Sequence, residues 1–261
     1  MKTVLTIAGF DPSGGAGILA DIKTMSRFGC YGVAAVTSLT LQNTRGVFGA
    51  YHQTADAVTG QLKAIFDDLE VGAIKIGMLP TREVVEAVAD SISSHPAPHI
   101  VLDPVIRSTS GFELVDEDAL TAIIRRLFPL ASVVTPNADE AGRITGLSVR
   151  DRPQMEQAAR AIVAMGASSV LVTGGDLEGD FATDLLVDHG VVAYTRERVV
   201  SRQTHGTGCT FSSALASLLV QGHSLRESIP IAKEYVARAI LGAPGLGSGR
   251  GPLNHFPEGF C

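Results

Sequence analysis

Short apolar runs rich in β-branched residues alternate along this 261-residue chain with longer stretches of helical periodicity. The predicted strands lie at residues 3–8, 32–40, 73–76, 100–102, 133–135 and 170–173. The predicted helices lie at residues 16–28, 55–69, 82–93, 117–130, 153–165, 208–221 and 225–241. Such alternation is typical of βαβ units, so we predict an α/β fold: a mostly parallel central sheet flanked by helices on both faces. Because α/β folds often exceed about 200 residues as one unit, we expect residues 1–261 to form a single domain.

Two segments depart from this alternation. Residues 187–200 place the turn Asp188-His189-Gly190 between two short apolar runs, which predicts an antiparallel hairpin at the sheet edge. The apolar run 4–10 follows Lys2 as in a secretory signal, but it ends at Asp11 without a small-residue cleavage site, so we predict a buried strand. No run approaches the about 18 apolar residues of a transmembrane helix, so we expect a cytoplasmic protein without a membrane partner.

The charge and cysteine patterns exclude two further classes of site. The formal charge is −6, and the densest basic stretches, at 125–126 and 196–202, are short and interrupted, so we expect no nucleic-acid partner. Cys30, Cys209 and Cys261 are far apart, with neither CxxC spacing nor a nearby histidine pair. This spacing favours reduced thiols over a zinc site.

Polar and glycine-rich segments follow the predicted strands, at residues 9–17, 41–44, 103–105, 135–140 and 205–209. In open α/β sheets ligands bind beyond the carboxyl ends of the strands, so these segments are the candidate site. The chain has no G-x-x-x-x-G-K-[ST] match, which excludes a P-loop, and residues 14–17 do not fit the G-x-G-x-x-G pattern of dinucleotide sites.

The segment 205–209 leads directly into a predicted helix. Gly206, Thr207 and Gly208 therefore direct consecutive backbone N–H groups at one point, which suits a phosphoryl group that gains charge during transfer. Cys209 falls in the first helical turn, where thiol pKa values are commonly depressed, so it is a candidate base for a substrate hydroxyl. The alternative is a glycine-rich turn followed by a buried structural cysteine.

Two acidic residues follow neighbouring predicted strands. Asn137 and Glu140 stand three residues apart, as in a helix capping box. The functional alternative is that Glu140, with Asp103 from the adjacent strand end, holds Mg²⁺ near ATP phosphates.

Two further polar residues have both a structural and a functional interpretation. Asp21 lies one turn into the first helix among apolar neighbours, and its structural interpretation is a solvated helix face. Gln42 ends an apolar strand, and its amide can donate and accept at once, as the edge of a pyrimidine requires. Its structural interpretation is a strand-end side chain bonded to the backbone.

Together these segments resemble the hydroxymethylpyrimidine/phosphomethylpyrimidine kinases of thiamine biosynthesis, which are members of the ribokinase-like superfamily. The resemblance extends over essentially the whole chain, and the combination of motifs is specific where any single one is weak. The motifs are LTIAG at 5–9, DPSGGAG at 11–17, QNT at 42–44, KIGML at 75–79, LDPV at 102–105, TPN at 135–137, EA at 140–141, HGTGC at 205–209 and GPLNHF at 251–256.

The resemblance implies a ribokinase-like fold and an ATP- and Mg²⁺-dependent kinase. Its substrate would be the hydroxymethyl group of 4-amino-5-hydroxymethyl-2-methylpyrimidine, followed by the monophosphate. The resemblance also implies the site residues. Gln42 would bind the aminopyrimidine, with Gly9, Asp21 and Met78 around it. The anion hole would be formed by Gly206, Thr207, Gly208 and Cys209, with Cys209 as the base where many relatives have aspartate. The nucleotide would lie near Asp103, Asn137 and Lys233, and the metal ion would be bound by Glu140 and Asp103.

Two segments depart from the family pattern. The chain reads Thr173-Gly174-Gly175-Asp176 where relatives often read Lys-Gly-Gly-His, and Thr109-Ser110-Gly111 where Lys-Ser-Gly is common. Both changes remove a positive charge near phosphates, so they bear on the second phosphorylation more than on the first.

Two other functions compete with this one. A pyridoxal kinase of the same fold is the nearest, and Gln42 together with the tail 251–256 favours the pyrimidine. A ligand-binding sensor without catalysis is the other, and the retention of Asp103, Glu140 and Cys209 argues against it. A homodimer is a further expectation, although the sequence does not determine the oligomeric state.

Overall fold

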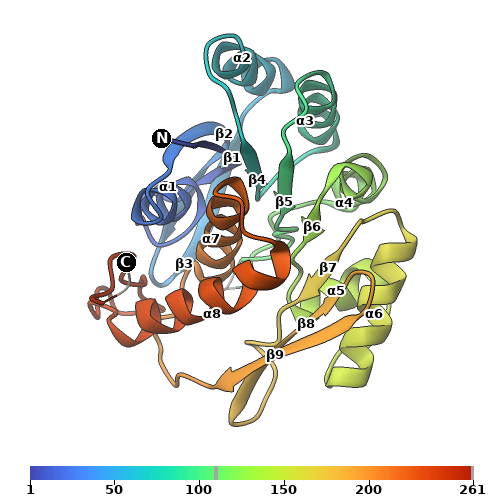
Figure 1. Ribbon diagram of the computed structural model, residues 1–261. Helices are drawn as coiled ribbons and strands as arrows, with labels where there is room; N and C mark the ends of the chain where they lie inside the picture. Colours follow the sequence, from blue (N-terminus) through green and yellow to red (C-terminus); the bar gives the residue numbers. More distant parts are fainter. Residues whose placement is uncertain (109–110, 260–261) are drawn as a thin grey trace.

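The computed structural model describes residues 1–108 and 111–259 and shows a twisted sheet between helices (Figure 1). Within these ranges nine strands form one sheet in the order β3-β2-β1-β4-β5-β6-β7-β8-β9. The strands are β1 (Thr3–Phe10), β2 (Tyr31–Asn43), β3 (Gly46–His52), β4 (Ala73–Ile76), β5 (His99–Leu102), β6 (Val133–Val134), β7 (Val170–Val172), β8 (Phe181–Val187) and β9 (Val191–Glu197). The helices are α1 (Gly17–Arg27), α2 (Ala55–Phe66), α3 (Arg82–Ser94), α4 (Glu117–Ala122), α5 (Ala138–Thr145), α6 (Arg152–Ala164), α7 (Thr207–Val220) and α8 (Leu225–Leu241).

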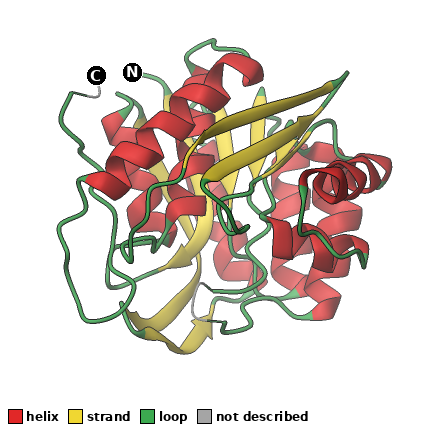
Figure 2. Ribbon diagram, turned by 90° about the horizontal axis from the view of Figure 1, so that it is seen from below, coloured by secondary structure: helices red, strands yellow, loops and turns green. Residues whose placement is uncertain are grey.

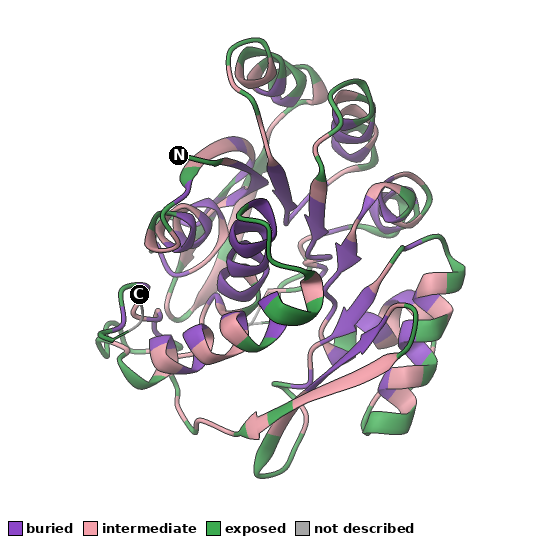
Figure 3. Ribbon diagram, viewed as in Figure 1, coloured by how far each residue is buried: buried purple, intermediate pink, exposed green. Residues whose placement is uncertain are grey.

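The sheet is parallel in its centre and antiparallel at its edges. The strands from β2 through β7 in the sheet order pair in parallel, whereas β3, β8 and β9 pair antiparallel with their neighbours. Figure 2 shows helices on both sides of the sheet. Each face has its own apolar core: α2 to α6 cover one face, and α1, α7 and α8 cover the other. Neighbouring residues such as Val4 and Leu5 point into opposite cores, which explains why the central strands read as continuous apolar runs. Figure 3 shows this burial along the central strands.

The predicted strands and helices are confirmed, with differences at their ends, whereas the helix α5 is absent from the prediction. The hairpin is at the sheet edge as predicted, but it starts at Phe181 and ends at Glu197. Its first strand is hard to recognise because the polar Asp184 interrupts the apolar pattern, although it is buried and paired with Lys233. The predicted helix 117–130 changes its hydrogen-bonding pattern after α4, through a π-helical turn (Ile123–Leu127) and a 3-10 turn (Phe128–Leu130).

The strand β3 is absent from the sequence prediction. Its residues are half-exposed or exposed, and it contains glycines at positions 46 and 49, so neither continuous hydrophobicity nor clear alternation marks it. It extends the sheet beyond β2 as an antiparallel edge strand.

The carboxyl ends of β1, β4, β5 and β6 gather at one edge of the sheet, because these strands run in parallel. This edge also receives the N-terminus of α7, which packs against β1, β4 and β5. In the part of the chain that the structure describes, no helix combines the length and the apolar composition needed to cross a bilayer.

Candidate active site

A cavity of about 800 Å³ opens at the carboxyl ends of the parallel strands. It brings together every predicted site residue except Asp21. The predicted residues that line it are Gly9, Gln42, Met78, Asp103, Asn137, Glu140, Gly206, Thr207, Gly208, Cys209 and Lys233. Residues from seven separate segments therefore converge on one space, as the position of the strand ends predicts.

The predicted anion hole lies at the start of α7. Gly206 is the N-cap residue, with a φ of 84°, and its carbonyl accepts the Thr210 N–H at 2.9 Å. A Cβ atom at position 206 would lie 1.9 Å from the Gly15 carbonyl oxygen, so only glycine fits. The first N–H groups of a helix have no acceptor within it, and here they lie at the cavity wall.

Cys209 lines the cavity in the first turn of α7, but the prediction of a depressed thiol pKa is wrong. Burial raises the pKa of Cys209 to about 12; the Lys75 ammonium opposes this rise, whereas Asp21 and Asp103 add to it. Desolvation in this position outweighs the helix terminus and the nearby cation. The thiol is therefore protonated at neutral pH.

Asp103 and Glu140 form a buried acidic pair. Asp103 is 4% exposed and accepts the Ser212 hydroxyl at 3.1 Å, and burial raises its pKa to about 6 although Lys75 opposes the rise. Glu140 is 7% exposed, and burial together with the charge of Asp103 raises its pKa well above the usual range. Since the charge of Asp103 makes ionisation of Glu140 more costly, a bound divalent cation would offset this repulsion, and the pair fits such a cation.

Among the described residues, no group of three or more His, Cys, Asp or Glu side chains is arranged to hold a metal ion. Two carboxyl groups are nevertheless the common protein share of a Mg²⁺ site, because substrate phosphates and water supply the other ligands. Asp103 and Glu140 have the donor chemistry for this arrangement.

The capping-box interpretation of Glu140 is confirmed. The Asn137 N–H donates to the Glu140 carboxylate at 2.9 Å, and the Glu140 N–H donates to the Asn137 side chain at 2.8 Å. Glu140 thus begins α5 and lines the cavity at the same time, so the structural interpretation does not exclude the functional one.

Asp21 lies behind the cavity wall, and its interpretation as a solvated residue is wrong. Its carboxylate is fully buried and lies 3.0 Å from the Lys75 ammonium, and it accepts the hydroxyls of Thr6 at 2.6 Å and Ser213 at 2.7 Å. Lys75 is also fully buried and lines the cavity. Burial lowers the pKa of Lys75, but Asp21 and the other acidic neighbours outweigh burial and raise it, so the ammonium stays charged.

Sequence reasoning assigned no role to Lys75. One signal was available, since a lysine inside the four-residue apolar strand β4 requires a buried partner.

Gln42 and Met78 lie on the other side of the cavity. Gln42 is at the end of β2, where it also lines an adjoining cavity of about 840 Å³ under the β2–β3 turn. A Cβ atom on Gly9 would lie 3.0 Å from the Met78 sulfur, so the thioether packs directly on the backbone of β1. These contacts form an apolar surface next to a polar amide, as an aromatic heterocycle requires.

Several cationic side chains line the cavity. Lys233 lines it, but its ammonium also pairs with Asp184 at 2.6 Å. Arg196 and Arg250 line it too, whereas Asp176 adds a negative charge that raises the pKa of Glu140 further. Thr109 and Ser110, the other departure, lie outside the described residues.

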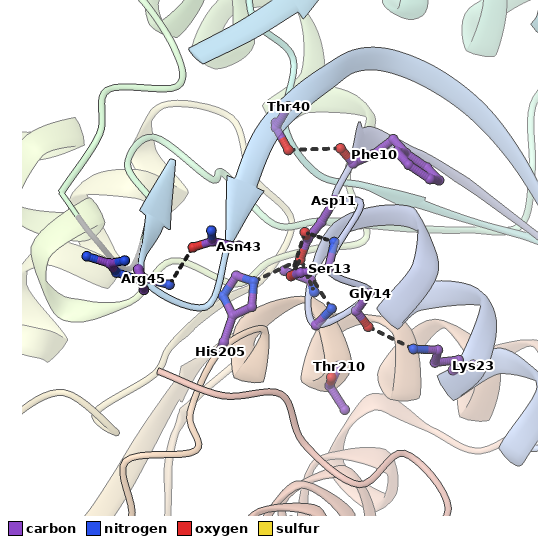
Figure 4. A network of polar contacts seen from close by, with 12 residues as sticks. Phe10, Asp11, Ser13, Gly14, Lys23, Thr40, Asn43, Arg45, His205 and Thr210 are labelled. Carbon is purple, nitrogen blue, oxygen red and sulfur yellow. Dashed lines mark hydrogen bonds and ion pairs between the residues drawn. The ribbon is translucent and has the colours of Figure 1, made fainter. Parts of the chain in front are cut away.

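Asp11 and His205 are a second pair that sequence reasoning missed. The His205 Nε2 atom lies 2.8 Å from the Asp11 carboxylate, and both residues line the cavity (Figure 4). The pair joins the glycine-rich segment after β1 to the segment before α7.

Comparisons with known proteins identify relatives of this chain. A family model described as phosphomethylpyrimidine kinase matches residues 11–254. The hydroxymethylpyrimidine/phosphomethylpyrimidine kinase of Rhizobium meliloti is 46% identical over 256 residues, which cover 97% of this chain and 96% of that protein. The thiamine biosynthesis bifunctional protein ThiED of Geobacter sulfurreducens is 44% identical, and the match covers 97% of this chain but 52% of that protein.

Solved structures show the same fold. The pyridoxal kinase of Bacillus subtilis, solved as an ADP complex, is 36% identical with a TM-score of 0.90, and the match covers 98% of this chain and 97% of that chain. The predicted ribokinase-like α/β fold is thereby confirmed. With a family model that spans nearly all of the sequence and a full-length relative at 46% identity, the chain belongs to the phosphomethylpyrimidine kinase family.

Proposed function

We propose that this kinase transfers the γ-phosphoryl group of ATP to the hydroxymethyl group of 4-amino-5-hydroxymethyl-2-methylpyrimidine and then phosphorylates the monophosphate to the diphosphate. One observation supports it most strongly: the pyrimidine-side residues Gln42 and Met78 share a single cavity with the glycine turn at Gly206 and the acidic pair. The names of the full-length relatives point to the same substrates.

The proposed chemistry depends mainly on positioning and charge. Phosphoryl transfer has a loose transition state, so the backbone N–H groups at the start of α7 can stabilise the transferring group without covalent catalysis. Asp103 and Glu140 would hold Mg²⁺ together with phosphate oxygens, and the bound ion would supply positive charge there. Lys75 lies on the α1 and α7 side of β4 and offsets part of the negative charge of Asp103.

Cys209 is the proposed acceptor of the hydroxymethyl proton. With its thiol pKa raised to about 12, Cys209 holds its own proton at neutral pH, and only its thiolate form can act as the base. Cation binding beside Asp103 would lower this pKa, because Asp103 is one of the charges that raises it. The role of Cys209 as a base therefore depends on a cation bound beside Asp103.

The nearest alternative is a pyridoxal kinase. The structural match to the B. subtilis pyridoxal kinase favours it, since that match includes nearly the whole chain. Gln42 favours the pyrimidine, because its amide suits the exocyclic amine and ring nitrogen of an aminopyrimidine.

The proposal extends to the molecule as a whole. One continuous sheet and a cavity built from both ends of the sequence support assignment of residues 1–261 to one kinase domain. The acidic composition and the reduced thiols support action in the cytoplasm, and a homodimer stays a prediction.

Mass spectrometry of the products tests the proposal. Incubation of the wild-type protein with ATP, Mg²⁺ and hydroxymethylpyrimidine should yield the monophosphate and then the diphosphate. Gly206→Ala should abolish product, because its Cβ atom would meet the Gly15 carbonyl at 1.9 Å. Gly222→Ala is the matched control: Gly222 also has a positive φ, at the far end of α7, but nothing lies within 4 Å of an added Cβ. Absence of both phosphates with the wild-type protein would contradict the proposal.

A further inference from the structure

Asp11 connects two loops of the cavity through one carboxylate. It is 2% exposed, and its Oδ2 atom lies 2.8 Å from His205 Nε2 (Figure 4). The same oxygen accepts the backbone N–H groups of Gly15 at 3.2 Å and Ala16 at 2.9 Å, while Oδ1 accepts the Ser13 N–H at 2.8 Å. The carboxylate thus holds the loop 11–17 in shape and binds the residue that precedes the predicted anion hole.

The loop 11–17 and the segment 205–209 are also tightly packed against each other. A Cβ atom on Gly15 would lie 2.4 Å from the His205 ring, and one on Gly206 would lie 1.9 Å from the Gly15 carbonyl. The backbone N–H of His205 donates to the Gly251 carbonyl at 3.2 Å. His205 is therefore fixed by its backbone on one side and by its side chain on the other, and the position of Gly206 follows from both.

Gln42 lines the same cavity as Asp11 and His205. Burial raises the pKa of Asp11, but the hydrogen bonds from His205 and Ser13 outweigh burial and bring the pKa well below the usual range. An ionised carboxylate only accepts hydrogen bonds, so the His205 ring donates to Asp11.

We propose that Asp11 and His205 are positioning residues for phosphoryl transfer. Asp11 binds the backbone of loop 11–17 on one side and His205 on the other, and thereby fixes where the backbone N–H groups of residues 206–209 lie relative to the end of β1. The inference rests on the proposed function, because it takes the role of this turn from it. Neither residue needs to contact the transferring phosphoryl group, since each acts through its neighbour.

The test compares His205→Leu, which removes the donor, with His205→Gln, whose side-chain NH₂ can still donate to Asp11. His205→Leu should lower kcat about 10- to 100-fold, because small misplacements of reacting groups cost rates of this size. KM for ATP and for hydroxymethylpyrimidine should stay close to wild type, and His205→Gln should recover most of the rate. His223→Leu, an exposed histidine after α7, is the matched control and should have wild-type kinetics.

A second measurement separates positioning from general damage. Asp11→Asn keeps the size of the side chain but places an NH₂ group where an oxygen accepts, so it should lower kcat as well. Adding His205→Leu to Asp11→Asn should then cost less than twofold more, because residues that act as a unit are not additive. If His205→Leu does not fold, His205→Asn, whose amide is too short to reach Asp11, replaces it in both comparisons.

The outcomes distinguish failure of the positioning role from failure of the proposed function. A wild-type kcat in folded His205→Leu, or full additivity of the two substitutions, overturns the positioning role and leaves the proposed function intact. A wild-type protein without turnover of hydroxymethylpyrimidine overturns both.

Discussion

At the scale of single residues, Cys209 lies beside the anion hole with a thiol whose pKa is raised to about 12. Only the thiolate form of Cys209 can accept a proton, so the thiol must first lose its own proton to solvent when bound positive charge lowers its pKa. This requirement separates Cys209 from a reactive surface cysteine, and it predicts slow alkylation of the ligand-free protein by iodoacetamide near neutral pH.

We expect Cys209→Ser to lower kcat by ~10²- to 10⁴-fold with KM little changed, because a serine hydroxyl is a still poorer base. Steady-state kinetics with hydroxymethylpyrimidine measures this. Cys209→Asp should recover part of the rate. Cys30→Ser, at a buried cysteine distant from the cavity, serves as control and should alter stability rather than kcat. A wild-type kcat in Cys209→Ser would leave the backbone N–H groups as the only contribution of this turn.

Glu140 combines a structural and a proposed catalytic role, and one substitution separates them. Glu140→Gln keeps an oxygen that can accept the Asn137 N–H, so the capping box persists. We expect it to raise the Mg²⁺ concentration needed for half-maximal rate. Glu227→Gln is the matched control, since Glu227 occupies the same place in the capping box of α8 and is exposed. Equal Mg²⁺ dependence in both variants would assign Glu140 to helix capping alone.

The same substitution has a predicted effect on stability. Because the pKa of Glu140 is raised on folding, the folded protein holds this proton more tightly than the unfolded chain, and the free energy of unfolding falls as pH rises above the ordinary carboxyl range. Removing the charge should therefore raise the urea midpoint of the ligand-free protein at neutral pH. The wild-type protein should have a lower urea midpoint at pH 7 than at pH 5, and this difference should be smaller in Glu140→Gln.

Residues at strand ends could be predicted from the sequence, whereas residues defined by distant partners could not. Asp103 and Glu140 were found because they follow apolar strands. Lys75 and His205 were missed because their partners lie 54 and 194 residues away, and no local pattern links them. The prediction of a depressed thiol pKa for Cys209 was wrong for a related reason. The start of the helix is visible in the sequence, but the desolvation of the thiol by distant parts of the chain is not.

At the scale of secondary-structure elements, the buried pair Lys75 and Asp21 joins β4 to α1, and Thr6 and Ser213 add β1 and α7. A charge that loses its partner in such a site is costly. We expect Lys75→Met to lower the free energy of unfolding by about 3 to 5 kcal/mol. Lys75→Met combined with Asp21→Asn should recover part of this loss, because no unpaired charge remains.

Urea denaturation of the two variants measures this coupling. As a control, Lys63→Met removes an exposed lysine whose i,i+4 partner is Asp67, and it should change stability by less than about 1 kcal/mol. A double variant no more stable than Lys75→Met alone would contradict the ion-pair account.

The longer helices with a clear periodicity were predicted, whereas the short helix α5 and strands with mixed exposure were not. α8 was predicted with both ends correct because its caps and apolar face agree. β3 and the first strand of the hairpin were missed or shortened because half-exposed strands lack a continuous apolar run. Sheet contacts, rather than local sequence, determine these edges.

At the scale of the whole molecule, the fold brings Asp11 beside His205 and pairs His205 with Pro252, so the cavity is complete only when the chain is folded from end to end. Alternating strands and helices predicted the fold class, but not the order of the strands, which depends on the direction of each crossover. The motifs supplied what periodicity could not, because together they identify one family.

The central claim concerns which heterocycle this cavity selects, and a direct competition tests it. We would measure kcat/KM for hydroxymethylpyrimidine and for pyridoxal with the same ATP and Mg²⁺, in the wild-type protein and in Gln42→Ala. The account predicts a higher value for the pyrimidine and a loss of about 1 to 3 kcal/mol of that preference in Gln42→Ala, because the substrate's polar edge loses its partner. A higher value for pyridoxal, with a ratio that Gln42→Ala leaves unchanged, would contradict it.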